Sequence, residues 1–388
     1  MSSPSTVVPI ARPTLPPVEE LQQRLAHILS GTELTNGAEV ARFEGEAAEV
    51  LEAPHCVAVS SCTAGLMLVE RCLSLRGAAV TPSFTFFATA HSLLWNGLRP
   101  VLADCDPTTF QIDPNSVRRV MTRGCSAIVG VHLFGCPAPI DELEKLAREA
   151  GVALIFDGAH ALGARWQGES VAGRGDATVY SLSPTKQMTC GEGGLITTRH
   201  AELARDLRKA RNYGKGEAYD CDLLGLNARM TEIQAAIARA SLARLEAAIA
   251  RRRYLADLYA KRLRDVPGVR LQRIPSAAVS SHKDFGVLVE RGVDRDQLMR
   301  DLAADGIETR AYFDPPLHRQ KLYRPYYRPQ EEALRTTDAV SRHILCIPIH
   351  GAVTDEDAAR IADRITELVG AQIARSMRTP MPLTAIPA

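Results

Sequence analysis

The stretch VALIFDGAHA, residues 152–161, contains the pattern that decides the fold. Its apolar residues lead without interruption into Asp157, and His160 follows three positions later. A strand without polar alternation is buried on both faces, as in a parallel sheet covered by helices. Ligands bind beyond the carboxyl ends of such strands, so we expect Asp157 at a binding edge. A turn-forming role for Asp157 and a structural role for His160 are the alternatives.

The same pattern recurs on both sides of this stretch. Further short apolar runs predict strands at 56–60, 78–82, 100–104, 127–134, 177–183 and 194–198. Helical patterns separate several of them, at 64–75, 89–97 and 140–151. Strands that alternate with helices indicate an α/β fold, in which a mostly parallel central sheet lies between layers of helices.

The chain of 388 residues is long enough for about two domains. The run from Thr231 to about Val266 predicts one long helix, which opens with a capping box of Thr231 and Gln234 and ends before Pro267-Gly268. We expect this helix to join the two domains. β-type segments and helices near 294–304 and 354–369 follow it and predict a smaller α+β domain. The expected division is an N-terminal arm (1–30) with a helix over 18–29, a large domain (31–250), a small C-terminal domain (251–375) and a flexible tail (376–388).

The composition excludes several classes of protein. With 46 Lys and Arg against 45 Asp and Glu, the net charge of +1 lacks the basic excess of a nucleic-acid binder. No apolar stretch is long enough for a membrane span, and the first residues lack the features of a signal peptide, so we expect a soluble cytoplasmic protein. The nine cysteines include no CxxC pair, which favours reduced thiols over disulfides or a metal site.

Polar groups also follow two other predicted strands, at residues 60–65 and at Lys186. Together with Asp157, they suit a single cofactor. Residues 60–65 begin a helix directly after a strand, where backbone N–H groups favour an anion, although simple N-capping fits them equally well. Lys186 follows the strand at 177–183 and is one of only seven lysines. In a partly dry pocket it would be a nucleophilic amine, whereas elsewhere it would be an ordinary surface lysine. An anion cradle, an acid and an amine at strand ends are together what a pyridoxal phosphate site requires.

Ordered motifs extend this interpretation over most of the chain. They are LTNGAEVARFE (34–44), SSCTAGL (60–66), PSFTFFAT (82–89), DGAHA (157–161), SLSPTK…GEGG (181–194), RNYG (211–214), LNARMTEIQAAI (226–237) and TRAYFDPPLH (309–318). In these motifs the chain resembles the DegT/DnrJ/EryC1/StrS family of sugar aminotransferases, over about residues 28–370. The resemblance implies the three-layer α/β/α fold of PLP-dependent transferases of fold type I. It also implies pyridoxal 5′-phosphate as cofactor, with pyridoxamine 5′-phosphate as its intermediate form.

The resemblance also assigns roles to individual residues. Lys186 matches the lysine that forms the internal aldimine and moves protons, and Asp157 matches the acid that pairs with the pyridine nitrogen. Phe86 matches the aromatic residue that stacks on the cofactor ring, whereas we expect Phe84 and Phe87 to be core residues. The other expected cofactor contacts come from Cys62 through its backbone N–H, Thr63, Ser181, and His160 beside the ring hydroxyl.

Three further matches concern the partner subunit and the substrate. Asn227 resembles an asparagine that reaches the phosphate from a neighbouring subunit, which implies a homodimer with shared active sites. Tyr312 and His318 match a segment that approaches the sugar nucleotide. The chain departs from the family pattern at Cys62, where Gly is usual, and at Gly65, where Ala is usual. Because only the backbone N–H is needed at residue 62, we expect cofactor binding to survive.

The implied reaction transfers an amino group from an amino acid donor, glutamate, to a keto group of a nucleotide-linked deoxysugar. Amination of a keto-cyclitol in aminoglycoside biosynthesis fits the same residues. A PLP-dependent sugar dehydratase is disfavoured, because family members of that kind resemble this chain but have histidine at the position of Lys186. We expect no metal, nucleic-acid or membrane partner.

Overall fold

The computed structural model describes residues 7–216, 219–290 and 292–378. Its centre is a seven-stranded sheet in the order β1-β9-β8-β5-β4-β2-β3. Neighbours from β8 to β3 pair in parallel, whereas β9 is antiparallel to β1 and β8. The predicted α/β fold with a mostly parallel sheet is confirmed. The strands span His55–Val59 (β1), Ala78–Pro82 (β2), Arg99–Ala103 (β3), Cys125–Val131 (β4), Ala153–Asp157 (β5), Ala177–Ser181 (β8) and Gly194–Thr198 (β9).

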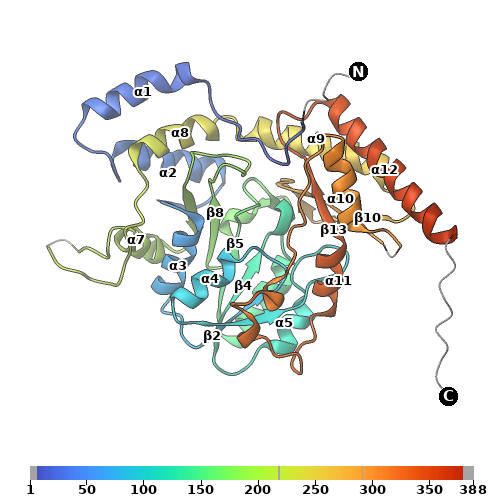
Figure 1. The fold of residues 1–388 in the computed structure, drawn as a ribbon. Coiled ribbons are helices and arrows are strands. Elements are labelled where there is room, and N and C mark those ends of the chain that lie inside the picture. Colours follow the sequence, from blue (N-terminus) through green and yellow to red (C-terminus); the bar gives the residue numbers. More distant parts are fainter. Residues whose placement is uncertain (1–6, 217–218, 291, 379–388) are drawn as a thin grey trace.

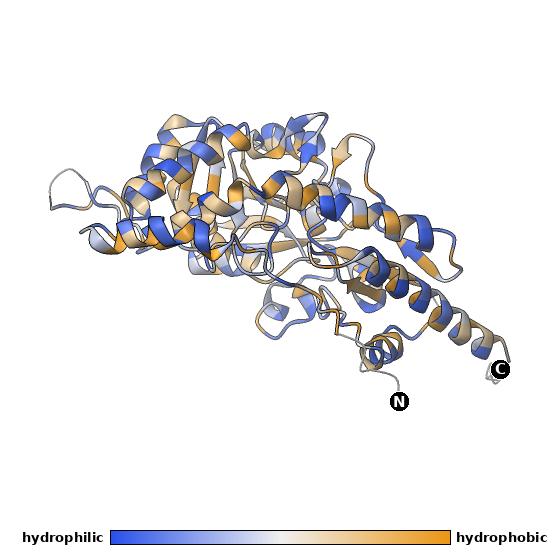
Figure 2. Cartoon of the chain, turned by 90° about the horizontal axis from the view of Figure 1, so that it is seen from above, coloured by the Kyte–Doolittle hydropathy of each residue, from blue (hydrophilic) through white to orange (hydrophobic). Residues whose placement is uncertain are grey.

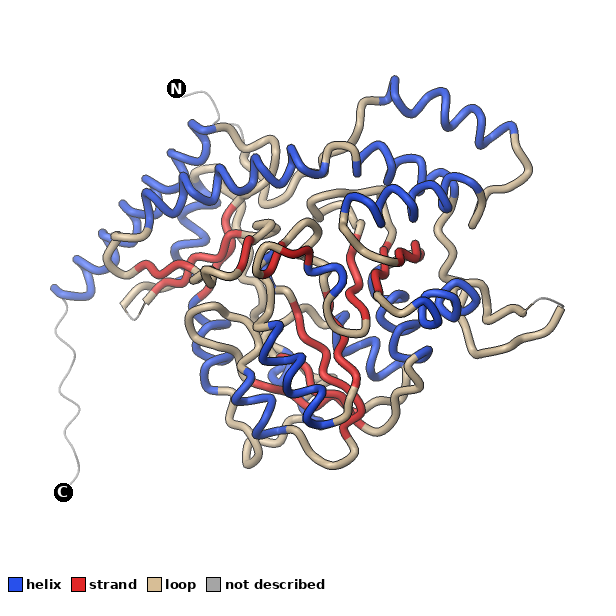
Figure 3. Tube along the Cα trace, turned by 180° about the vertical axis from the view of Figure 1, so that it is seen from behind, coloured by secondary structure: helices blue, strands red, loops and turns tan. Residues whose placement is uncertain are grey.

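Helices cover both faces of this sheet (Figures 1 and 3). Successive strand residues enter different cores: Ile128 and Leu154 pack on one side, whereas Val129 and Ile155 pack on the other. This double burial explains the uninterrupted apolar runs in the sequence. Figure 2 shows the surrounding helices with hydrophilic and hydrophobic residues intermixed, as expected where one side is buried. The helices span Ala38–Val50 (α2), Cys62–Cys72 (α3), Ala88–Trp95 (α4), Pro114–Val120 (α5), Ile140–Ala150 (α6) and Ala201–Ala210 (α7).

Two predicted strands end earlier than expected. β4 ends at Val131 and continues into a 3-10 helix, and β8 ends at Ser181. After each of these two strands, the chain leaves the sheet at the edge that forms the candidate site. The apolar residues that follow are buried but do not pair with a neighbouring strand. The short 3-10 helices of the chain span Leu133–Gly135 (η1), Val171–Gly173 (η2), Leu317–Arg319 (η3) and Arg324–Tyr326 (η4).

The predicted single helix over 231–266 is wrong. The capping box of Thr231 and Gln234 is present, but the segment divides into α8 (Glu232–Leu242) and α9 (Leu245–Leu263). Neither glycine nor proline lies at the break, so local sequence gives no signal for it. Tertiary contacts hold the break from both sides. Ser241 donates a hydrogen bond to the Thr189 carbonyl, and Leu242 and Leu245 pack in the same core.

The second unit is built around an antiparallel sheet of β10 (Val269–Leu271), β12 (Phe285–Val289) and β13 (Ile344–Ile347). Its helices are α10 (Arg295–Ala304), α11 (Arg335–His343) and α12 (Asp355–Arg378). α9 connects the two units. Ile249 near its start packs in the core of the large sheet, whereas Leu255 and Leu263 pack in the core of the second unit. The division expected at residue 250 therefore falls within a continuous helix.

The remaining elements are peripheral. α1 (Val18–Ser30) matches the helix predicted in the N-terminal arm and packs on α8. A second three-stranded sheet joins β6 (Arg165–Trp166), β7 (Glu169–Ser170) and β11 (Ala278–Val279). Of the tail expected over 376–388, residues 376–378 continue α12, and 379–388 lie outside the described residues. Within the described parts of the chain, no helix has the length and apolar character needed to cross a membrane.

Candidate active site

Three strand ends meet at one edge of the large sheet. β1, β5 and β8 run in the same direction, so the residues that follow them lie together. A cavity of about 300 Å³ opens at this edge. Thr85, Ser183 and Glu192 help to line it and were not predicted. The structure also brings seven predicted cofactor residues to this cavity, namely Cys62, Thr63, Phe86, Asp157, His160, Ser181 and Lys186.

The first helical turn of α3 forms an anion-binding cup. The Ser61 hydroxyl caps the helix by accepting a hydrogen bond from the Ala64 N–H at 3.1 Å. Within the described structure, no hydrogen-bond acceptor is found for the Cys62 and Thr63 N–H groups. Gly194 packs directly on the peptide that begins this cup, because a Cβ atom there would lie 2.6 Å from the Ser61 carbonyl carbon and 2.7 Å from the Cys62 nitrogen. The cup therefore has the free donors and the positive helix end that a phosphate needs.

The two departures from the family pattern in α3 have different environments. The Cys62 thiol lies 3.6 Å from the Val179 carbonyl oxygen. At Gly65, an added Cβ atom would lie 2.7 Å from Val179 Cγ1. The helix thus packs so closely on β8 that the alanine of the family pattern would force Val179 or the helix to move.

Asp157 lies at the end of β5 with its carboxylate held from two sides. The Thr89 hydroxyl donates a hydrogen bond to Oδ2 at 2.7 Å, and the Ala159 N–H donates to Oδ1 at 3.0 Å. Burial raises the pKa of Asp157, while these hydrogen bonds and the nearby Lys186 act in the opposite direction. Thr89 is a contact that the sequence reasoning did not assign, although it closes the motif PSFTFFAT. The arrangement orients an acid toward the cavity, where it can pair with a protonated ring nitrogen.

Lys186 follows β8 and lines the same cavity. Among the described residues, no acid lies within ion-pair distance of its ammonium group. Burial lowers the pKa of Lys186 to about 8, and the positive charge of Lys283 adds to this effect. A lysine with a lowered pKa is partly uncharged near neutral pH and can act as a nucleophile or a base.

His160 has a defined hydrogen-bonding state. Its Nδ1 accepts a hydrogen bond from the Phe134 N–H at 3.2 Å. Burial, assisted by the charges of Lys186 and Lys283, holds the pKa of His160 well below its usual range. The ring is therefore neutral, and its proton lies on Nε2. That N–H is the group His160 can offer to a ligand.

The three phenylalanines of PSFTFFAT differ in environment. Phe84 is buried, as expected, and makes edge contacts with neighbouring rings. Phe86 lines the cavity and is partly exposed, as a residue that stacks on a cofactor would be. Phe87 was expected in the core, but its side chain is 42% exposed and packs on Phe86 with ring centroids 3.9 Å apart. The apolar character of this position alone gave no sign of its exposure.

Three predicted residues lie outside the cavity. Asn227 is exposed, and its backbone forms a bridge with Asn212. Tyr312 is half-buried, with the Lys283 ammonium 5.6 Å from its ring centroid. His318 is buried, and its nitrogens lie 2.8 Å from Ser83 Oγ and 2.9 Å from Asp338 Oδ1. Because both ring nitrogens are already engaged, His318 holds η3 against the large domain instead of reaching the cavity.

A buried ion pair lies beside the cavity and was missed. Lys283 and Asp284 are each 6% exposed, and their charged atoms are 2.8 Å apart. The second Asp284 oxygen lies 3.7 Å from His160 Nδ1 and has no hydrogen-bond partner among the described residues. The scarcity of lysine in this chain was the signal that could have found Lys283. Its charge acts on Lys186 from the side of the second unit.

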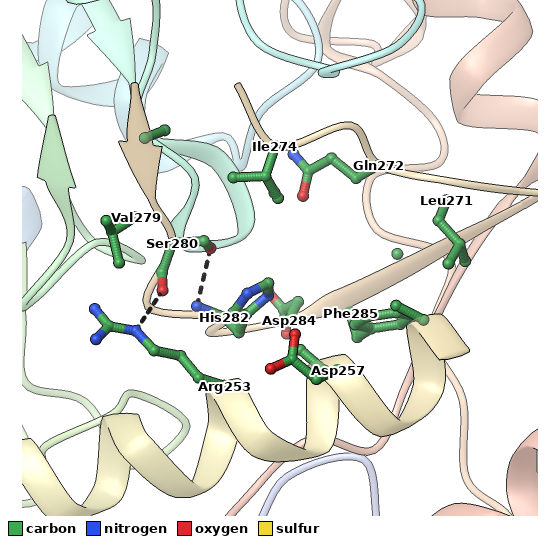
Figure 4. Close-up of a pocket in the computed structure, with 14 residues that line it drawn as sticks. Arg253, Asp257, Leu271, Gln272, Ile274, Val279, Ser280, His282, Asp284 and Phe285 are labelled. Atoms are coloured by element: carbon green, nitrogen blue, oxygen red, sulfur yellow. Dashed lines mark hydrogen bonds between the residues drawn. The ribbon is translucent and has the colours of Figure 1, made fainter. Parts of the chain in front are cut away.

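Another cavity, of about 330 Å³, lies between α9 and the segment 271–286 (Figure 4). In Figure 4 the Arg253 guanidinium from α9 meets the Ser280 carbonyl, and the Ser280 hydroxyl accepts from the His282 N–H. None of the predicted site residues lines this cavity. Its described lining residues include no lysine and no start of a helix, so its chemistry does not match the cofactor.

Sequence comparison identifies the family. Residues 17–366 match the DegT/DnrJ/EryC1/StrS aminotransferase family. The chain belongs to this family. This aminotransferase is 28% identical to dTDP-4-amino-4,6-dideoxy-D-glucose transaminase of Escherichia coli, over 91% of the chain and 96% of the relative. It is 32% identical to dTDP-3-amino-3,4,6-trideoxy-α-D-glucose transaminase of Streptomyces venezuelae, over 90% and 92%.

The aminotransferase also resembles a UDP-linked sugar enzyme and several solved structures. It is 32% identical to UDP-N-acetyl-3-dehydro-α-D-glucosamine 3-aminotransferase of Acidithiobacillus ferrooxidans, over 89% of the chain and 92% of that relative. The structure of DesI with its TDP-sugar product superposes with a TM-score of 0.89 at 35% identity, covering 96% of each chain. The structure of Streptomyces venezuelae DesV with a ketimine intermediate gives a TM-score of 0.85 at 32% identity, covering 92% of this chain and 99% of that one.

Proposed function

We propose that this aminotransferase uses pyridoxal 5′-phosphate to move an amino group from glutamate to a keto group of a nucleotide-linked deoxysugar. The observation that carries the proposal is the meeting of an anion cup, a buried acid and a lysine of lowered pKa around one cavity. The sugar substrate is supported by the relatives, whose names refer to dTDP- or UDP-linked sugars.

The residues around the cavity fit this cofactor. The free N–H groups of Cys62 and Thr63 would hold the phosphate, Asp157 would pair with the ring nitrogen, and the Lys186 amine would bind the aldehyde carbon. When bound, pyridoxal phosphate supplies an aldehyde that accepts an amino group and a ring that withdraws electrons from the reacting carbon. Phe86 would cover the ring, and the Nε2–H group of His160 would face its hydroxyl.

Lys186 is also the candidate for proton transfer. Because burial and Lys283 lower its pKa to about 8, about a tenth of its amine is uncharged at pH 7. The uncharged amine can accept a proton from a substrate carbon, and the resulting ammonium can return that proton to a neighbouring atom. Of the residues that the structure describes, no other lysine lines the cavity, so we assign both transfers to Lys186.

We also propose a homodimer in which the subunits share active sites. Asn227 supports this proposal because its side chain is exposed and lies outside the cavity of its own chain. The flanking Tyr213 and Leu224 are exposed apolar residues, which favours their burial against a second subunit. Mixing Lys186→Ala chains with Asn227→Ala chains tests the arrangement, since a hybrid dimer would regain one intact site. Mixtures that regain no activity would contradict the role of Asn227.

The cysteines support a reducing compartment, and we propose the cytoplasm. All nine are free thiols, and most are buried. Burial raises the pKa of several of them, including Cys56 and Cys190. Such thiols remain protonated and unreactive, as is common for structural cysteines in cytosolic enzymes.

Nitrogen-labelled glutamate and a panel of keto substrates test the reaction. The panel includes dTDP- and UDP-linked 3-keto and 4-keto sugars and keto-cyclitols. We expect the label in an amino sugar, with loss of multiple turnovers and of the lysine-linked cofactor absorbance in Lys186→Ala. Lys145→Ala, an exposed lysine on α6, is the matched control. Label found in an aminocyclitol would show that the substrate is a keto-cyclitol and not a nucleotide-linked sugar. A deoxygenated product without label would indicate a dehydratase. Steady turnover by Lys186→Ala would contradict the proposed role of Lys186.

A further inference from the structure

A second buried acid lies behind Asp157. Glu70, on α3, is 1% exposed, and its carboxyl group faces α4. Its partners are Ser92, 2.6 Å from Oε1, and the Asn96 amide, 2.8 Å from Oε2. In the described parts of the chain, no cation lies within ion-pair distance of this carboxyl group. A buried carboxylate without a cation is costly, so Glu70 requires an explanation.

The hydrogen atoms around Glu70 can be counted. The Asn96 amide has two, which account for its bonds to Glu70 Oε2 and to the Met67 carbonyl at 2.9 Å. Ser92 has one hydroxyl hydrogen, but its Oγ lies within bonding distance of both Glu70 Oε1 and the Thr89 carbonyl, at 2.6 and 2.9 Å. If Glu70 is ionised, both of these oxygens are acceptors, and the single Ser92 hydrogen can serve only one of them.

A proton on Glu70 resolves this conflict. The carboxylic acid then donates to Ser92 Oγ, and Ser92 donates its own hydrogen to the Thr89 carbonyl. Every polar group in the cluster is satisfied, and no isolated charge is buried. Burial raises the pKa of Glu70 to about 7, and the negative charge of Asp157 acts in the same direction.

Thr89 connects this cluster to the candidate site. Its carbonyl faces Ser92, while its hydroxyl donates to Asp157 Oδ2 at 2.7 Å. The Thr85 hydroxyl, 3.1 Å away, is the remaining side-chain partner of the Thr89 hydroxyl. The orientation of Asp157 therefore depends on how firmly α4 is held against α3, and Glu70 links these two helices through Ser92 and Asn96.

We propose that Glu70 is a positioning residue that acts as a neutral carboxylic acid, holding α4 so that the Thr89 hydroxyl orients Asp157. In this state Glu70 adds no negative charge behind Asp157. Ionised Glu70 would place a negative charge behind Asp157 and leave Ser92 with one hydrogen for two acceptors. The role of Asp157 toward the cofactor rests on the proposed function, whereas the proton on Glu70 does not.

Glu70→Gln tests the proton, because the amide donates to Ser92 and accepts from Asn96 without a charge. Since folding raises the pKa of Glu70 from 4.5 to about 7, its contribution to stability is complete below pH 4.5 and is lost as the pH rises toward 7. Glu70→Gln should match the natural protein near pH 4.5 and exceed it in thermal stability above pH 7. The difference in the unfolding equilibrium constant should be on the order of a hundredfold. The protonated-carboxyl infrared band of the apo protein should weaken in Glu70→Gln.

Ser92→Ala and Glu70→Leu test the link to Asp157. Both should change the pH at which the absorbance of bound pyridoxal phosphate titrates, whereas Glu70→Gln should leave that pH unchanged. If Glu70→Leu does not fold, the pH titration of cofactor absorbance in Ser92→Ala tests the same link. A tenfold loss of cofactor affinity in Glu70→Gln at pH 6 would contradict the proposal that Glu70 is protonated. An unchanged titration in Ser92→Ala would overturn the positioning role. Because stability and infrared readings use the apo protein, their outcome is independent of the proposed reaction.

Discussion

The residues that line the cavity and the buried pair Lys283–Asp284 beside it are held in place in different ways. Asp157 and the N–H groups of the cup lie where the backbone places them, at a strand end and at the start of a helix. Lys283 and Asp284 precede β12, where their backbone is hydrogen-bonded but, within the described structure, their charged groups are neutralised only by contact with each other. Backbone geometry makes the first set robust, whereas the second set depends on charges that balance one another in a buried place.

The two sets of residues therefore have different proposed tasks: one binds the ligand, and the other adjusts the pKa of Lys186. The strand-end groups provide the donors, the acid and the amine of the candidate site. Lys283 and Asp284 act on Lys186 through their charges, which shift the pKa of Lys186 in opposite directions. Replacement of a strand-end group should therefore abolish a function, whereas replacement of the pair should move its pH dependence.

The largest effect is expected for Asp157→Asn. The amide retains the shape of the side chain but cannot hold a protonated ring nitrogen by charge. We expect kcat to fall by about a hundredfold to a thousandfold, the usual loss when one preorganised electrostatic contact is removed. Steady-state rates of amino transfer and the absorbance of bound cofactor measure it. Asp363→Asn, at an exposed acid of α12, is the control. Activity close to that of the natural protein would contradict the role of Asp157.

An intermediate effect is expected for Lys283→Met. Without the ammonium, the pKa of Lys186 should rise above about 8, and each pKa unit lowers the uncharged fraction of Lys186 tenfold at a given pH below the pKa. Activity at pH 7 should fall several-fold and recover at higher pH. Because Asp284 is then left unpaired, the double variant with Asp284→Asn is the matched control, and it should recover stability and part of the shift. An unchanged pH profile in Lys283→Met would show that the pair does not tune Lys186.

The smallest effect is expected for Cys62→Gly. The thiol faces Val179, and the N–H group of residue 62 is retained, so affinity for pyridoxal phosphate should change less than about threefold. Gly194→Ala is the opposing control, because its methyl group would lie 2.7 Å from the Cys62 nitrogen and displace the peptide that begins the cup. Spectroscopic titration of the apo protein with cofactor compares the two variants. Equal losses in both would show that the Cys62 side chain itself belongs to the binding site.

Local patterns predicted much of the large domain. The apolar runs around Asp157 and Lys186 identified β5 and β8, because burial on both faces leaves a continuous signal in the sequence. The order of these strands, and the reversal of β9 between β1 and β8, could not be predicted, since pairing depends on residues far apart in the chain. The break between α8 and α9 left no local sign, because all residues near it favour helix and the contacts of Ser241 and Leu242 decide it.

The candidate site divides in the same way. The sequence by itself determined the chemical types at the strand ends, because an acid, an amine and a helix start after buried strands are short-range features. Only the tertiary structure decided which groups share one cavity. It also buries His318 between Ser83 and Asp338 and places Glu70 behind Asp157. Burial and the distances between charges set the pKa of Lys186 and of Glu70, and both quantities arise only when distant segments pack together.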